Sequence, residues 1–331
     1  MIFETEKADK LTVPDSINTN AAFLADVLQG LSSSPKKLDS KYFYDATGDS
    51  LFQQIMASAE YYVTRCEAEI FTTHAAEIAG ALNQDYDAFD LIELGAGDAS
   101  KTIYLLQELI GINRNFRYVP VDISGSIIDY LEKELPLKLP GLVVEGLKGE
   151  YLAMLQKANS ISKRKKVVLF LGSNIGNMDT AQALDFLKEI RKNLNEGDRM
   201  LIGFDLKKDP LTVLAAYNDK AGYTSAFNLN LLHRINRELG ANFILNQFEH
   251  YPTYDPISGA CKSYLVSKAA QQVCIAGKII KFGLGEVIDM ELSQKYDSQE
   301  IKLLAQQSGF QAKKMYTDQQ HWFVDTIWEC V

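Results

Sequence analysis

Leu91-Ile-Glu-Leu-Gly-Ala-Gly-Asp98 is the stretch that decides the fold, because a short apolar run ends there in a glycine-rich turn. We expect residues 91–94 to form a strand and residues 100–110 to form an amphipathic helix. Gly95 and Gly97 permit backbone conformations and a close approach of ligand that a Cβ would prevent. In an open α/β sheet such a turn lies beyond the carboxyl ends of the strands, where ligands bind.

Apolar runs and amphipathic stretches alternate after this turn. We expect strands at residues 116–122, 142–145, 166–171 and 199–205, and helices at residues 126–134 and 181–194. The strand expected at residues 166–171 is apolar throughout, as in strands that are covered on both faces. The alternation predicts right-handed β-α-β units and therefore an α/β fold with a Rossmann-like, doubly wound, mostly parallel sheet.

Two regions break the alternation, which suggests a second subdomain. The first 60 residues are expected to be mainly helical, residues 211–238 helical with an interruption near Gly222, and residues 248–291 strand-like. We assign residues 1–60 and 201–286 to an α+β subdomain that binds substrate. Residues 61–200 and 287–331 are assigned to the cofactor-binding core, with residues 310–328 returning to the main sheet.

Composition excludes several classes of protein. The chain has 331 residues, 47% of them hydrophobic, with a net charge of −9. The acidic balance argues against a nucleic-acid partner. The basic run at residues 163–166 is interpreted as a solvated loop, with an anion patch as the alternative.

The chain also lacks signals for export, membrane insertion or metal binding. Its first residues have no apolar signal-peptide core, and no apolar stretch approaches the ~18–20 residues that cross a bilayer. The four cysteines and four histidines are dispersed. We therefore expect a cytoplasmic monomer with no metal site and no membrane contact, acting on a small molecule.

Polar residues follow the other predicted strands. Asp122 is placed where a carboxylate accepts ribose hydroxyls, although a turn or N-cap aspartate is the alternative. Glu150 could accept an adenine amine, and residues 171–177 bring glycine backbone and the Asn177 amide to the same edge. Ser100 replaces the third glycine of the dinucleotide motif. Four such strand ends without a phosphate cradle favour S-adenosylmethionine (SAM) over NAD.

Eight segments carry a resemblance to one known family, at residues 41–48, 50–52, 60–65, 170–177, 205–210, 215–217, 224–230 and 236–240. Among them the F-Y-D-x-x-G, Y-Y-x-T-R and A-F-N-x-N patterns are specific. The chain resembles the histidine-specific Nα-methyltransferases of ergothioneine biosynthesis, SAM-dependent enzymes that make trimethylhistidine (hercynine). The resemblance covers nearly the whole chain and implies a class I SAM-dependent methyltransferase fold.

The resemblance implies the roles of individual residues. Cofactor contacts are implied for Tyr44, Gly95, Lys101, Asp122, Glu150, Tyr151, Gly172 and Ser173, to which the glycine turn itself adds Gly97. Substrate contacts are implied for Phe52, Tyr61, Asn177, Tyr217, Thr224, Glu291 and Ser293. The tyrosines and the asparagine would hold the amino and carboxylate groups, and Glu291 and Ser293 the imidazole. Residues two apart on a strand point to one face.

Two positions depart from the family pattern. The family has Asp-Phe where this chain has Glu150-Tyr151, a conservative change. Ser263 aligns with a methionine that packs the imidazole pocket, so the pocket is expected to be larger and more polar here. This second change makes another amino acid, such as tryptophan or a histidine derivative, the alternative substrate.

Methyl transfer from a sulfonium to an amine requires alignment more than a strong base. A free α-amino group titrates near ~8, and a nearby sulfonium favours its neutral form. We expect Tyr44 and Asn177 to orient the amine and act as the catalytic residues. Taken alone, each tyrosine would be read as packing and Glu291 as a surface carboxylate. A NAD-dependent oxidoreductase, which would need a catalytic His/Arg set, and a catalytically silent SAM-binding module are the other hypotheses.

Overall fold

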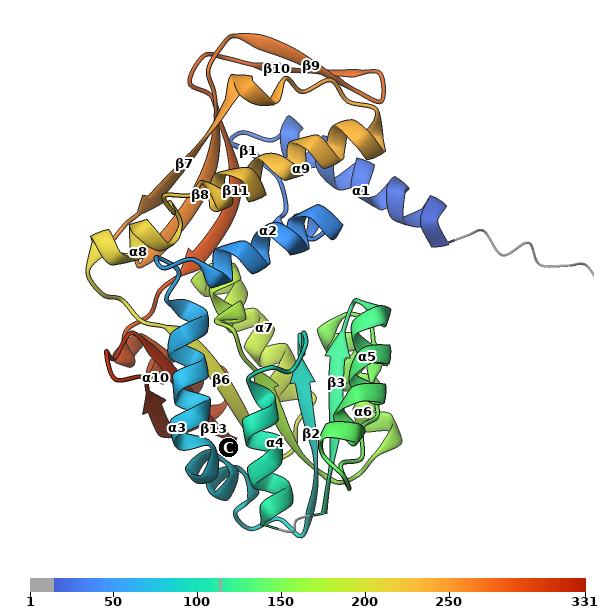
Figure 1. Cartoon of the computed structure of the whole chain (residues 1–331), viewed down its shortest axis with the longest axis vertical. Coiled ribbons are helices and arrows are strands. Elements are labelled where there is room, and N and C mark those ends of the chain that lie inside the picture. The colour runs from blue at the N-terminus through green and yellow to red at the C-terminus, as the bar shows by residue number, and fades with distance from the viewer. Residues whose placement is uncertain (1–14, 113–114) are drawn as a thin grey trace, which may run out of the picture. The chain divides into compact units, whose positions relative to one another are not determined.

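The computed structural model describes residues 15–112 and 115–331. These form two compact units (Figure 1). The larger unit contains residues 56–219, 253–261 and 292–331, and the smaller unit contains the residues up to 55 together with 220–252 and 262–291. Each unit is described below by itself.

A seven-stranded sheet forms the centre of the larger unit, in the order β12-β13-β6-β5-β2-β3-β4. The strands are β2 (Ala88–Leu94), β3 (Asn115–Asp122), β4 (Leu147–Lys148), β5 (Lys165–Phe170), β6 (Arg199–Asp205), β12 (Phe310–Thr317) and β13 (Phe323–Cys330). β2 to β6 pair in parallel, whereas β13 pairs antiparallel with both β6 and β12. The predicted α/β fold with a mostly parallel sheet is therefore confirmed.

Helices cover both faces of this sheet. They are α3 (Val63–Asn83), α4 (Thr102–Gly111), α5 (Gly125–Lys138), α6 (Tyr151–Ile161), α7 (Thr180–Lys192), α8 (Pro210–Ala216) and α10 (Ser298–Gln307). Successive strand residues enter opposite cores: Leu91 packs with α3, α4 and α5, whereas Ile92 packs with α6, α7 and α10. This alternation follows from the two-residue period of a strand. It produces the doubly wound arrangement.

Two sequence-based boundaries were wrong. Residues 142–145 form no strand: Val144 makes an isolated bridge to Tyr118, and the chain pairs with β3 again only in β4. The expected domain boundary at residue 200 falls inside β6, which pairs with β5 on one side and β13 on the other. That pairing keeps residues 201–219 with the larger unit.

The smaller unit combines helices with strands. Its helices are α1 (Asp15–Ser32), α2 (Ala46–Ala57), α9 (Tyr223–Leu239) and the short η1 (Ser40–Tyr42) and η3 (Leu245–Gln247). One sheet has the order β1-β11-β8-β7, from β1 (Lys36–Lys37), β11 (Val287–Gln294), β8 (Ala260–Ser267) and β7 (Phe248–Tyr254), and β9 (Gln271–Ile275) pairs with β10 (Lys278–Phe282). Gly222, with φ of +79°, separates α8 from α9, as predicted. Of the helices described, none combines the length and apolarity needed to cross a membrane.

Candidate active site

The glycine turn after β2 packs closely on the end of β3. Gly95 has φ of +78°, and its N–H donates to the Val121 carbonyl over 2.8 Å. Gly97 has φ of +52°, and its N–H donates to Asp122 Oδ2 over 3.3 Å. A Cβ built on Gly97 would meet no atom within 4 Å, so the turn borders open space there. The glycines thus hold backbone against Asp122 and leave room for a ligand.

Asp122 combines the two roles that its sequence position suggested. Its Oδ1 accepts from the Ser124 N–H over 2.9 Å, as in a turn aspartate, while its Oδ2 contacts the glycine turn. The side chain is only half-buried. A carboxylate accepts up to about four hydrogen bonds, so it retains capacity for a diol.

Tyr151 lies beside this turn at the start of α6. A Cβ on Gly95 would lie 2.8 Å from the Tyr151 hydroxyl. Burial, together with the negative charges of Asp122 and Glu150, raises the pKa of Tyr151 to about 12. The phenol therefore keeps its proton at neutral pH and is available as a hydrogen-bond donor.

The loop after β5 completes the cofactor-binding half of the site. Gly172 and Ser173 both have positive φ, +73° and +56°. Ser173 Oγ accepts from the Asp205 N–H over 3.2 Å, and the Asn174 side chain lies within 3.4 Å of a Cβ built on Gly95. Asn177, at the end of η2 (Asn174–Asn177), is exposed. The predicted residues Gly95, Gly97, Asp122, Tyr151, Gly172 and Ser173 are thus brought to the carboxyl ends of β2, β3 and β5.

Lys101 is paired with a residue that the sequence analysis missed. Its ammonium forms an ion pair with Glu67, a side chain of α3 with no exposed surface. Glu67 Oε1 also accepts from the Gly172 N–H over 2.6 Å. Glu67 lies on the same helical face as the buried Ile70 and Phe71. A carboxylate on an apolar helix face was the signal that could have identified it.

A second missed group connects two predicted substrate residues of the larger unit. Tyr217 donates to Ser293 Oγ over 2.7 Å, and the fully buried Lys295 ammonium donates to both oxygens, over 2.7 and 2.8 Å. Lys295 also forms an ion pair with Asp205 Oδ2 at 2.7 Å. The Tyr61 and Tyr217 rings meet edge to face, with centroids 6.2 Å apart. Tyr217 and Ser293 are therefore bonded to one buried ion pair, and Tyr61 packs on the Tyr217 ring.

The smaller unit gathers other predicted residues by itself. Tyr44, Phe52 and Phe227 form an aromatic group, with Tyr44 5.6 Å from each of the other two ring centroids. Ser263 is buried on β8, and its Oγ lies 3.3 Å from His250 Nε2. The remaining two residues are Thr224, buried in the first turn of α9, and Glu291, half-buried on β11.

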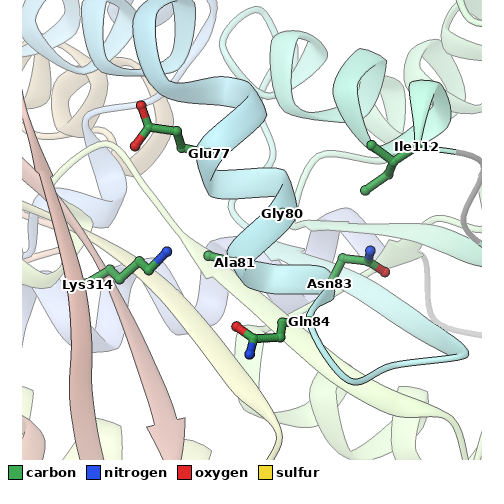
Figure 2. Close-up of a pocket in the computed structure, with 7 residues that line it drawn as sticks. All are labelled: Glu77, Gly80, Ala81, Asn83, Gln84, Ile112 and Lys314. Carbon is green, nitrogen blue, oxygen red and sulfur yellow. The ribbon is translucent and has the colours of Figure 1, made fainter.

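One cavity of about 490 Å³ lies elsewhere in the larger unit (Figure 2). It is lined by Glu77, Gly80, Ala81, Asn83, Gln84, Ile112 and Lys314, from the end of α3, the chain after α4 and β12. None of the residues predicted from the sequence lines it. The chemistry-bearing residues lie at the strand ends instead, so this cavity is not the candidate active site.

The strand ends fit an adenosyl sulfonium donor. Asp122 offers carboxylate oxygens to a ribose, Tyr151 offers a phenolic donor, and Gly97 leaves open the space that a Cβ would fill. Six of the predicted cofactor residues contribute to this region, and together they combine backbone, carboxylate and hydroxyl groups.

Comparisons with known proteins identify the family of the chain. The profile of a family described as "Histidine-specific methyltransferase, SAM-dependent" matches residues 23–330. Histidine N-alpha-methyltransferase of Mycolicibacterium smegmatis is 35% identical over 92% of this chain and 91% of its own. Ergothioneine biosynthesis protein 1 of Neurospora crassa is 31% identical over 86% of this chain and 32% of its own. 4-Dimethylallyltryptophan N-methyltransferase of Claviceps fusiformis is 27% identical over 58% of this chain and 56% of its own.

Proposed function

Since this chain belongs to the family of SAM-dependent, histidine-specific methyltransferases, we propose that it methylates the α-amino group of L-histidine and forms trimethylhistidine (hercynine) for ergothioneine biosynthesis. The observation that carries the proposal is the family match over residues 23–330, which includes every proposed site residue. SAM is the methyl donor, and the substrate is a small molecule.

SAM, when bound, supplies an electrophilic methyl group on a sulfonium sulfur. Asp122 accepts hydrogen bonds from the ribose hydroxyls, and the backbone of Gly95 and Gly97 approaches SAM closely. The remaining contacts to SAM come from Lys101, Glu150, Tyr151, Gly172 and Ser173. Tyr44 and Asn177 orient the substrate amine through polar contacts. Such alignment can lower a barrier by ~7–11 kcal/mol, so no strong base is needed.

The larger unit, in this proposal, binds SAM, and the smaller unit contributes to substrate recognition. Tyr61, Asn177 and Tyr217 hold the amino-acid backbone, and Glu291 and Ser293 hold the imidazole. Phe52, Thr224 and Ser263 line the substrate pocket. We further propose a cytoplasmic monomer without metal or nucleic acid, in line with the net charge of −9.

Mass spectrometry after incubation with SAM tests the activity directly. L-histidine should gain one, two and three methyl groups in succession, and L-tryptophan and 4-dimethylallyltryptophan should gain none. Transfer to a tryptophan and none to histidine would refute the proposed substrate and favour the alternative raised by Ser263.

Calorimetry with S-adenosylhomocysteine present tests the role of Glu291. Glu291→Ala should weaken L-histidine binding by ~1.5–3 kcal/mol, because a hydrogen bond to a charged group is lost. Glu249→Ala, which removes an exposed carboxylate from β7 of the same unit, is the matched control and should leave the affinity unchanged. Equal affinities for both variants would remove the imidazole role.

A further inference from the structure

The buried ion pair at the end of β6 has more partners than a structural salt bridge needs. Asp205 and Lys295 have no exposed surface, and Asp205 also pairs with Lys208 and accepts from the Tyr62 hydroxyl over 3.0 Å. Burial disfavours the Lys295 ammonium, but the facing Asp205 carboxylate outweighs it and keeps the pKa of Lys295 above its ordinary value. Lys295 is therefore a cation at neutral pH, with three protons to donate.

Lys295, Tyr217 and Ser293 form a hydroxyl cluster in which the protons can be counted. The ammonium donates its three protons to Asp205, Tyr217 and Ser293. Tyr217 donates its own proton to Ser293 Oγ. Ser293 Oγ thus accepts two hydrogen bonds, which fills both of its lone pairs. Its remaining proton can only be donated to a group outside the cluster.

Exposure indicates where that outside group lies. Ser293 and Tyr217 keep 7% and 8% of their surfaces exposed, whereas Lys295 keeps none. Ser293 and Tyr217 are therefore the residues of the cluster that keep some surface for a ligand, whereas Lys295 acts only through its hydrogen bonds to them.

We propose that Lys295 is a positioning residue which, through Tyr217, fixes Ser293 as a hydrogen-bond donor, so that the enzyme selects a substrate ring whose nitrogen facing Ser293 is unprotonated. This inference rests on the proposed function, because it takes Ser293 as a contact of the substrate imidazole. The selected species is the neutral imidazole in a single tautomer. An imidazolium has an N–H donor at both ring nitrogens, so one of them would face the Ser293 hydroxyl donor with no acceptor between the two.

Other titratable groups surround Lys295, and their protonation bears on the pH dependence of binding. Those facing it or coupled to it are Asp205, Lys208, Tyr61, Tyr62, Tyr217, Tyr254 and Cys261. Lys295 and Lys208 outweigh burial and hold the pKa of Asp205 below its usual range. Burial raises the pKa of Tyr62 well above its ordinary value and that of Tyr254 above its own. Burial lowers the pKa of Lys208, and its ion pair with Asp205 opposes that shift. The pKa shifts of Asp205, Tyr62 and Tyr254 all move away from the range between pH 5.5 and 7.5, so these three groups keep their charge while the substrate ring titrates. Glu291 is the charged group proposed to face the ring itself.

The test is the pH dependence of L-histidine binding, measured by calorimetry with S-adenosylhomocysteine bound. Since imidazole titrates near ~6.5, wild-type affinity should fall about tenfold from pH 7.5 to pH 5.5. Lys295→Met should weaken binding at pH 7.5 by about tenfold or more and flatten the pH dependence to under about threefold, because the hydroxyls can reorient. Ser293→Ala, which keeps the ion pair, should flatten it equally.

Lys208→Met is the matched control. It removes the other ammonium on Asp205 but has no hydrogen bond to Tyr217 or Ser293, so it should keep the wild-type pH dependence. If wild type methylates histidine but its affinity for histidine rises or stays constant towards pH 5.5, this inference is overturned and the proposed function is not. If wild type transfers no methyl group to histidine, the proposed function fails first and this inference fails with it.

Discussion

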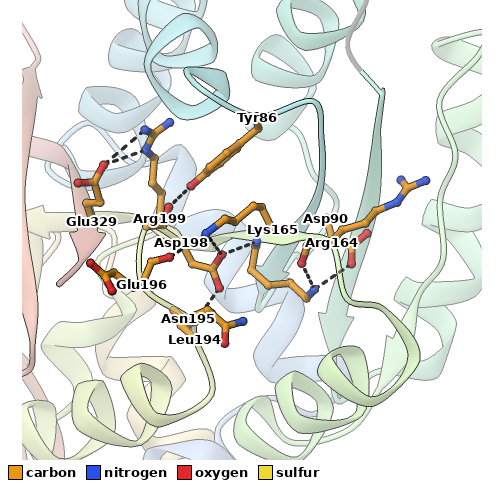
Figure 3. A network of polar contacts seen from close by, with 12 residues as sticks. Tyr86, Asp90, Arg164, Lys165, Leu194, Asn195, Glu196, Asp198, Arg199 and Glu329 are labelled. Carbon is orange, nitrogen blue, oxygen red and sulfur yellow. Dashed lines mark hydrogen bonds and ion pairs between the residues drawn. The ribbon is translucent and has the colours of Figure 1, made fainter.

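The two ends of the parallel strands in the larger unit both hold buried ion pairs, but they are built differently. At the amino ends, Asp90 of β2 lies between Arg117 and Lys166, at 3.2 and 3.3 Å. Each cation there has a further partner: Arg117 pairs with Glu145, and Lys166 donates to two backbone carbonyls. Figure 3 shows this region continuing through Asp198, whose side chain accepts from backbone, to Arg199 and Glu329.

At the carboxyl ends the pairing is less redundant. Lys295 pairs with the carboxylate of Asp205 and otherwise donates to the hydroxyls of Tyr217 and Ser293. Ser173, which has a positive φ, accepts from the N–H of Asp205. We infer that the ion pairs at the amino ends stabilise the sheet, whereas the ion pair at the carboxyl ends positions hydroxyl groups that face a ligand.

Removing the central carboxylate at each end, Asp205 or Asp90, should give the largest difference between the two ends. Asp205→Asn leaves Lys295 and Lys208 buried without a counter-charge, so we expect the free energy of unfolding to fall by ~3–5 kcal/mol and methyl transfer to be lost. Asp90→Asn should cost less, ~1–3 kcal/mol, because Arg117 and Lys166 keep other partners, and activity should persist. Urea denaturation and a methyl-transfer assay measure both. Equal losses of stability and activity at the two ends would contradict the contrast.

Glu93, a fully buried carboxylate of β2 between the two ends, should make stability depend on pH. Its oxygens accept from the Thr102 and Tyr118 hydroxyls, but burial outweighs them and raises the pKa of Glu93 to about 7. The folded state therefore holds a proton that the unfolded state releases near pH 4.5. Stability should fall as pH rises from about 4.5 to 7, by up to ~3 kcal/mol.

Glu93→Gln should reduce this decline, which urea denaturation at pH 5 and pH 7.5 would detect; burial also raises the pKa of Asp325, which contributes in the same direction. The exposed Glu77→Gln serves as the control and should keep the wild-type difference between the two pH values. A Glu93→Gln protein that loses as much stability as wild type over this range would show that Glu93 does not titrate there.

The smallest expected difference between the two ends of the strands is in the affinity for the cofactor product. Asp122→Asn replaces one acceptor oxygen by a donor, so the affinity for S-adenosylhomocysteine should drop by ~1.5–3 kcal/mol with little change in stability. Asp198→Asn, at the amino ends, should lower stability because its oxygens accept from the Lys166 and Asn195 N–H groups, and should leave the cofactor affinity intact. Calorimetry on both variants decides, and a normal affinity in Asp122→Asn would exclude the ribose role.

Sequence patterning predicted the parallel core because strand and helix periods are local properties. β6 matches its predicted bounds, and β2, β3 and β5 lie within a few residues of theirs. The edge of the sheet at residues 142–148 escaped prediction, since whether a short apolar run pairs depends on its neighbour. Glycine turns and polar residues after the strands indicated the edge of the sheet that binds the cofactor, and the family resemblance implied the individual contacts.

The sequence by itself determined the class of fold and which strand ends carry chemistry, because apolar periodicity and glycine turns act over a few residues. Only the tertiary structure decided the partners of the buried charges. Glu67 joins Lys101 to Gly172, and Lys295 joins Asp205 to Tyr217 and Ser293, across separations of up to 105 residues. Burial makes an unpaired charge costly, so each of these side chains is fixed by its partner in space and not by its neighbours in the chain.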